Sequence, residues 1–272
     1  MTKTKEYPLG LVLSGGGARG WAHIGVLQAL EENGIYPQVI AGSSAGAIVG
    51  ASYAAGIEPK KMLELVKDTT MFKVYKGGLS NFALFKSRGV MEMSYVRKIF
   101  EKYLPLDDFD ELDKKLFVCV TNINEGEYEI KHRGSVIDAV LASAAFPLVF
   151  TPQLIRGIPY LDGGLVNNLP VEPLKNLCEK VIGVNVNPHH FDKKVNGLVS
   201  ISQRCFEIVV WQNTKPRLRQ CDIIIEPVEV FDYALFDFKK ADELYQHGYD
   251  TTKQLMPEIR AKLKEEVTEE QS

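Results

Sequence analysis

The stretch Gly42-Ser43-Ser44-Ala45-Gly46 has the residue types and spacing of a nucleophile elbow. In such an elbow a strand turns sharply into a helix, and glycines are needed because a Cβ would strike the neighbouring elements. The apolar run 38–41 predicts the strand, and the small-residue segment 45–55 predicts the helix. Ser44 would then lie at the tip of the turn, where the first helical amides favour negative charge. The alternative interpretation is an ordinary strand-to-helix turn with a serine N-cap.

A glycine-rich loop, Gly15-Gly16-Gly17-Ala18-Arg19-Gly20, precedes the elbow. Consecutive glycine amides can form an oxyanion hole, and Arg19 would add a cation near a bound phosphate or oxyanion. The same loop fits the dinucleotide pattern G-x-G-x-x-G, but that function requires an acidic residue at the end of the second strand. The predicted second strand ends in Ala41-Gly42-Ser43. An oxyanion hole is therefore favoured over a nucleotide-binding module or a turn without a ligand.

A serine nucleophile needs a group that accepts its proton. The chain has five histidines, which are His23, His132, His189, His190 and His247. Only the adjacent pair 189–190, which follows a predicted strand, is placed as the histidine of an α/β-hydrolase esterase would be. Asp162 is better placed, at a strand-to-turn junction followed by Gly163-Gly164, although these three residues alone would also fit a plain turn.

Taken together, the motifs at 15–20, 42–46 and 162–164 resemble the patatin-like phospholipase family. The stretch Ala142-Ser143-Ala144-Ala145-Phe146-Pro147 also resembles that family's block ahead of the aspartate, and the likeness covers about residues 7–250. The resemblance implies a serine lipid acyl hydrolase, a phospholipase A or lysophospholipase-like esterase that works through an acyl-enzyme without histidine. The roles that it implies are Ser44 as nucleophile, Asp162 as base, Gly16 and Gly17 as oxyanion donors supported by Gly15 and Arg19, and Gly20, Gly42, Gly46, Gly163 and Gly164 as supporting motif residues.

The segments around the motifs predict an α/β fold. The chain begins with a strand at 9–14, a helix at 21–33, the second strand and the elbow helix, an order that indicates a parallel sheet with right-handed crossovers. Both glycine turns then lie at one sheet edge and share a crevice. We expect a patatin-like three-layer fold with a mainly parallel central sheet flanked by helices. One domain would span 1–264, with a final helix that breaks near Pro257 and a charged tail at 265–272.

Composition limits the remaining possibilities. The 272 residues include 45% apolar and 25% charged residues, enough for a core, and the net charge of −3 argues against nucleic acid. The four cysteines lack C-x-x-C spacing and predict reduced thiols in a cytoplasmic protein. No leader, membrane-spanning run, metal motif or cofactor is predicted. A lipid or lysophospholipid is the expected partner, with at most transient peripheral contact with a membrane surface; the oligomeric state is left open.

Two aromatic-rich stretches, 71–85 and 231–236, do not follow helical periodicity. Either they are loops anchored to the core, or they form an apolar flap over the crevice at Ser44. We interpret 71–85, with Gly77-Gly78 as its hinge, as the flap.

Overall fold

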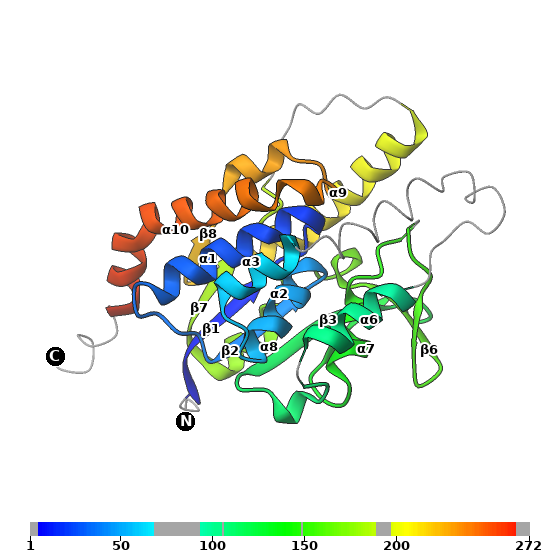
Figure 1. Cartoon of the computed structure of the whole chain (residues 1–272), viewed down its shortest axis with the longest axis horizontal. Helices are drawn as coiled ribbons and strands as arrows, with labels where there is room; N and C mark the ends of the chain where they lie inside the picture. Colours follow the sequence, from blue (N-terminus) through cyan, green and yellow to red (C-terminus); the bar gives the residue numbers. More distant parts are fainter. Residues whose placement is uncertain (1–4, 68–92, 105, 148, 189–196, 265–272) are drawn as a thin grey trace.

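The computed structural model of the chain describes residues 5–67, 93–104, 106–147, 149–188 and 197–264 (Figure 1). The tail at 265–272, the pair His189 and His190, and the stretch 71–85 lie outside the described residues.

The described residues form one mixed sheet with helices on both faces. The strands are β1 (Tyr7–Leu13), β2 (Val39–Ser43), β3 (Lys115–Asn122), β4 (Glu127–Lys131), β5 (Gln153–Ile155), β6 (Ile158–Asp162), β7 (Cys178–Val184) and β8 (Ile223–Ile225). Their order is β5-β6-β3-β2-β1-β7-β8, with β4 paired to β3. The run from β3 through β8 is parallel, whereas β4, β5 and β6 pair antiparallel. The predicted mainly parallel sheet is confirmed.

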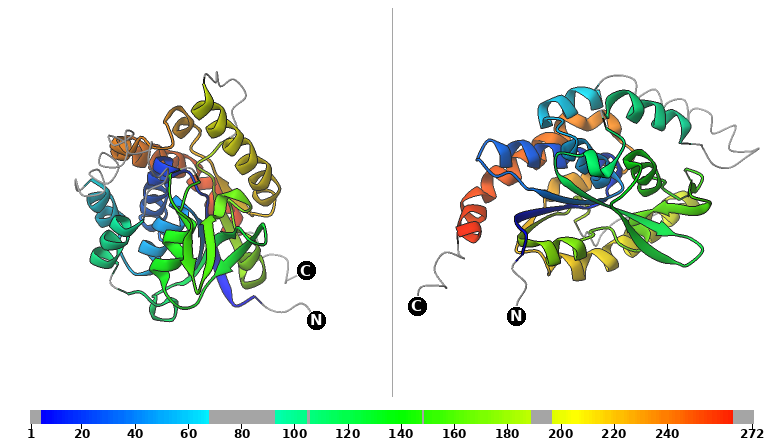
Figure 2. Two further views of the ribbon diagram at one scale, coloured as in Figure 1. Left: turned by 90° about the vertical axis from the view of Figure 1, so that its right-hand side faces the viewer. Right: turned by 90° about the horizontal axis from the view of Figure 1, so that it is seen from below.

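The helices connect and cover these strands. They are α1 (Trp21–Glu31), α2 (Ala45–Ala54), α3 (Pro59–Lys67), α6 (Ser94–Tyr103), α7 (Val136–Ser143), α8 (Glu172–Leu177), α9 (Leu198–Leu218) and α10 (Ala241–Lys264). Short 3₁₀ turns include η1 (Gly17–Gly20), η3 (Gly163–Leu165), η4 (Val228–Asp232) and η5 (Phe238–Lys240). Figure 2 shows α8 and α9 below the sheet and α1, α3, α6 and α10 above it.

The central strands are buried on both faces, as a three-layer architecture requires. In β1, Leu11 and Leu13 join the larger core, beneath α1, α2 and α10, while Val12 joins the smaller core with α8 residues. In β2, Ile40 faces the larger core and Ala41 the smaller one. This alternation follows from the two-residue period of a strand.

Strand β3 brings together two segments that are far apart in the sequence. Its Cys119 pairs with Ser43, the last residue of β2, and its next residue, Val120, pairs with Asp162, the last residue of β6. Strand β3 therefore places the end of β2, which leads into Ser44, close to Asp162 at the end of β6.

The predicted break in the last helix is wrong. Helix α10 continues through Pro257, although proline removes a backbone donor and disfavours a helix interior. The neighbouring side chains explain how the helix persists, because Met256 and Ile259 are both buried in the larger core.

Helices α1 and α10 pack closely through glycines. A Cβ on Gly248 would overlap the carbonyl oxygen of Ala22, and a Cβ on Gly25 would overlap that of Tyr245. Larger residues would force these helices apart.

We therefore expect Gly248→Val to lower the free energy of unfolding by about 1–3 kcal/mol or more, because it overpacks this contact. Gln246→Val, on the exposed side of the same helix, is the matched control and should change stability by about 0.5 kcal/mol or less. Urea denaturation measures both; equal effects would contradict the close packing.

Candidate active site

The elbow at Ser44 has the predicted strand, turn and helix. Ser44 is the N-cap of α2 and has φ 51° and ψ −121°, a backbone conformation that is strained for a residue with a side chain. A Cβ on Gly46 would overlap the Leu13 carbonyl of β1, and a Cβ on Gly42 would lie 2.5 Å from the Gly46 carbonyl. Glycines at both positions therefore allow the turn to close against β1.

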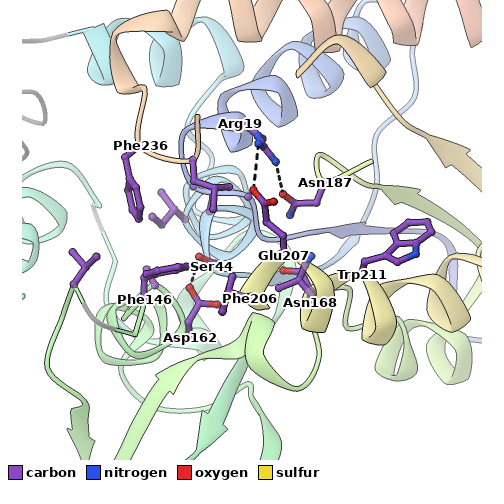
Figure 3. A pocket seen from close by; sticks show the side chains of 18 of the residues that line it. Arg19, Ser44, Phe146, Asp162, Asn168, Asn187, Phe206, Glu207, Trp211 and Phe236 are labelled. Carbon is purple, nitrogen blue, oxygen red and sulfur yellow. Dashed lines mark hydrogen bonds and ion pairs between the residues drawn. The ribbon is translucent and has the colours of Figure 1, made fainter. Parts of the chain in front are cut away.

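Ser44 lies directly against Asp162. Its Oγ donates a hydrogen bond of 2.7 Å to Asp162 Oδ2 (Figure 3). The backbone N–H of Gly164 donates one of 2.8 Å to Oδ1. The Asp162 backbone is held as well, because its carbonyl oxygen accepts a bond of 2.9 Å from Thr121 Oγ1. Both carboxylate oxygens are thus fixed in orientation.

The carboxyl group of Asp162 is almost fully removed from water, with 1% of the residue exposed. Burial raises its pKa from 3.8 to about 6, because the charged form loses hydration. The hydrogen bonds from Ser44 and Gly164 oppose this rise, since both favour the carboxylate. The result is a carboxylate that is a stronger base than an exposed one and is still largely ionised at neutral pH.

Ser143 also positions the elbow, a role that the sequence did not reveal. Its Oγ accepts a hydrogen bond of 2.8 Å from the Ser44 backbone N–H and donates one of 2.6 Å to the Cys119 carbonyl. The only signal in the sequence was its place in the stretch 142–147.

The backbone of the glycine loop is hydrogen-bonded at Gly15 but, within the described residues, not at the N–H groups of Gly16 and Gly17. The N–H of Gly15 donates to the Asn168 carbonyl at 3.2 Å, and its carbonyl accepts a bond from Asn187 Nδ2. Among the described residues, none accepts a hydrogen bond from the N–H of Gly16 or Gly17, and both glycines line the same cavity as Ser44. Gly15 therefore anchors the loop rather than offering its amide, and Asn168 and Asn187 are positioning residues that the sequence reasoning missed.

Arg19 is buried, lines the same cavity as Gly16 and Gly17, and is bound to protein groups. Its guanidinium donates to the carbonyls of Tyr233 at 2.9 Å and Phe231 at 3.3 Å, and it forms an ion pair with Glu207 at 3.8 Å. Burial lowers its pKa, while Glu207 raises it. Arg19 thus ties the glycine loop to α9 and to the segment at 231–233.

An apolar cavity of about 200 Å³ opens beside Ser44 and Asp162. Aromatic rings form much of its wall: Phe146 contacts Phe206 edge-on at 4.5 Å between centroids and Phe236 at 5.4 Å. Phe231, Leu235 and Phe236 all line it, so the stretch 231–236 faces the cavity. Such a wall excludes water and suits an apolar ligand.

The described histidines have other partners. His23 is fully buried, and its Nε2 lies 2.8 Å from the Ser14 carbonyl; burial lowers its pKa to about 4. His247 contacts the Tyr233 hydroxyl, and the His132 ring lies 5.7 Å from that of Phe117. Within the described residues, no three His, Cys, Asp or Glu side chains form a group that could hold a metal ion.

Comparison with known proteins identifies similar sequences and folds. Residues 11–175 match the model of a family described as patatin-like phospholipase. The chain is 29% identical to lysophospholipase nte1 of Aspergillus fumigatus, over 93% of this chain and 18% of the relative. It is 30% identical to lysophospholipase NTE1 of Candida glabrata, over 89% of this chain and 16% of the relative. The chain thus spans less than a fifth of the length of these relatives.

A solved structure has a similar fold. VipD from Legionella pneumophila superposes with a TM-score of 0.53 at 18% sequence identity, over 93% of this chain and 67% of that chain. At this identity the likeness bears on the fold, and it supports the expected architecture.

The burial of Asp162 leads to a stability prediction. Because the folded pKa of about 6 exceeds the ordinary value of 3.8, the folded state binds more protons, and stability falls as pH rises from about 4 to 6. Asp162→Asn should therefore raise the free energy of unfolding at pH 7.5, by up to about 3 kcal/mol, and by much less at pH 4.

Chemical denaturation at the two pH values measures this effect. Asp250→Asn, on an exposed position of α10, is the control and should show little difference. A variant that is less stable than wild type at pH 7.5 would contradict the expected cost of the buried charge.

Proposed function

This chain belongs to the patatin-like phospholipase family, and on that premise we propose that it is a serine lipid acyl hydrolase. The observation that carries the proposal is the 2.7 Å hydrogen bond from Ser44 Oγ to the buried Asp162 carboxylate, at the wall of an apolar cavity. A nucleophile in contact with a base of raised pKa, beside a surface that suits an acyl chain, favours hydrolysis of lipid esters.

In the proposed first half-reaction, Asp162 takes the Ser44 proton as Oγ attacks the ester carbonyl carbon. The carbonyl oxygen becomes an oxyanion, and the N–H groups of Gly16 and Gly17 are the donors that we assign to it. The tetrahedral intermediate then collapses, the bond to the alcohol breaks, and Asp162 returns the proton to the leaving alkoxide. An acyl-enzyme on Ser44 remains.

In the second half-reaction, water loses a proton to Asp162 and attacks the acyl carbonyl. Collapse of the second tetrahedral intermediate releases the fatty acid, and Ser44 recovers its proton from Asp162. One carboxylate thus serves both steps, and the raised pKa of about 6 supports this double role, because a group near neutrality can accept and return protons.

The substrate class that we propose is a lysophospholipid or a related lipid ester. Two observations support this class: the relatives are lysophospholipases, and the lining of the cavity is apolar. The α/β-hydrolase and nucleotide-binding alternatives are not favoured, because the family match and the contact between Ser44 and Asp162 point to a dyad.

All four cysteines have free thiols, which supports a reducing compartment, and we propose a cytoplasmic location with transient contact with the membrane surface. No helix in the described parts of the chain has the length and apolarity needed to cross a bilayer.

The nucleophile assignment can be tested with a fluorophosphonate probe. Wild type should be labelled on Ser44, and Ser44→Ala should lose both labelling and ester hydrolysis, by about 10³-fold or more, because the attacking oxygen is gone. Ser94→Ala, at the exposed start of α6, is the matched control and should keep both. Peptide mapping by mass spectrometry identifies the site; robust labelling of the Ser44 variant would refute the assignment.

The pH dependence tests the base. Because Asp162 acts as a carboxylate and its pKa is raised to about 6, kcat/KM on a water-soluble short-chain ester should increase about tenfold per pH unit below 6 and level off above it. The rate of fluorophosphonate labelling should follow the same curve. An acidic limb centred near pH 4 would instead indicate an ordinary exposed carboxylate.

A further inference from the structure

Helix α2 has a single accessible line of residues that begins at the nucleophile. Within α2 and its N-cap, only Ser44, Ile48 and Ser52 are partly exposed, and every other residue is buried. A spacing of four residues places all three on one face of the helix. With a rise of about 1.5 Å per residue, this face extends ~12 Å from the Ser44 position to Ser52.

This face leads from the dyad into a second cavity of about 70 Å³. Trp21 and Ile48 line both the cavity at Ser44 and this second one, so the two are adjacent and share these side chains as a wall. The second cavity lies between α1, α2, α3 and α6, and its lining includes Val49, Met62, Leu65, Ile99 and Phe100.

The lining of the second cavity suits hydrocarbon. The Ser52 hydroxyl donates a hydrogen bond of 2.9 Å to the Ile48 carbonyl, so its polarity is satisfied within α2. Most of the remaining lining side chains are aliphatic or aromatic. Transfer of a hydrocarbon chain from water into this cavity is favourable. It does not break the hydrogen bond of the Ser52 hydroxyl, because that bond lies within α2.

Several polar lining residues of the first cavity lie towards α9. Asn187 follows β7, and Arg204 and Glu207 belong to α9. Helix α9 covers the opposite face of the sheet from α3 and α6 (Figure 2). An ester held at Ser44 would thus have both polar and apolar side chains towards α9, and an apolar path along α2. This arrangement orients the alcohol part and the acyl part of a substrate.

We propose that the acyl chain of the substrate extends from Ser44 over Ile48 along α2, and that its terminal carbons occupy the second cavity. This inference rests on the proposed function, and it adds that the second cavity sets the preference for acyl chain length. Because burial of one methylene is worth about fourfold in binding, filling the cavity should penalise long chains selectively.

The test compares Leu65→Trp, which fills the second cavity, with Glu64→Trp, which places the same side chain on the exposed face of α3. The substrates are p-nitrophenyl esters of four, eight, twelve and sixteen carbons, presented at fixed detergent concentration. Leu65→Trp should lower kcat/KM tenfold or more on the twelve- and sixteen-carbon esters and less than twofold on butyrate. Glu64→Trp should match wild type throughout.

Ser52→Leu provides an independent variant, since it narrows the same cavity from α2 rather than from α3. It should shift the ratio of long-chain to short-chain rates in the same direction, at an unchanged melting temperature. Labelling rates with ethyl and dodecyl fluorophosphonates give a readout that does not require turnover, and only the dodecyl probe should react more slowly.

The outcomes separate this inference from the proposed function. If wild type hydrolyses butyrate and is labelled on Ser44, but folded variants lose activity equally on all chain lengths or shift the ratio less than threefold, the second cavity does not hold the acyl chain. If wild type neither hydrolyses any ester nor is labelled, the proposed function itself fails.

Discussion

The contact between Ser44 and Asp162 depends on holding a carboxylate inside the protein next to a strained backbone turn. Neither feature is favourable by itself, because a buried charge loses hydration and a positive φ is strained for serine. The sheet makes both possible. Adjacent residues of β3 pair with the ends of β2 and β6, and hydrogen bonds from Thr121 and Gly164 then hold Asp162 in place. The two cores that bury the central strands stabilise the sheet that carries this site.

The glycine loop is held by contacts on every side except the one that faces the cavity. Asn168 and Asn187 hold Gly15, the Leu235 carbonyl accepts the Ala18 N–H, and Arg19 links the loop to α9 through Glu207. Such an arrangement keeps donor groups in a fixed orientation before substrate arrives, which is the condition under which backbone amides stabilise a developing charge. The buried arginine thus contributes to the geometry of the loop.

The local features of the site could be read from the sequence because each depends on short-range sterics. Glycine spacing around Ser44 predicted the elbow, and strand–turn–helix order predicted the parallel sheet. Contacts between distant segments could not be read: the stretch 142–147 singled out the neighbourhood of Ser143 but not its bond to the elbow, and no feature near Asn187 indicates that the fold brings it to the loop. Residue type alone also did not reveal the partners of Arg19: it indicated a cation beside the glycine loop, and the structure adds an ion pair with Glu207. Pro257 misled, because tertiary packing of its neighbours outweighs its local preference.

The open amides of Gly16 and Gly17 have a consequence for mutagenesis. Alanine scanning reads function by removing side-chain atoms, and these positions have none to remove. Substitution there adds an atom instead, and a Cβ on Gly16 would lie 2.5 Å from Val186 Cγ2. A loss of activity in such a variant would therefore reflect steric crowding as well as misalignment of the backbone N–H groups. An alanine scan would thus test the proposed roles of the Ser44 and Asp162 side chains and leave the proposed backbone donors unresolved. Backbone chemistry, such as amide-to-ester replacement, is the perturbation matched to this part of the site.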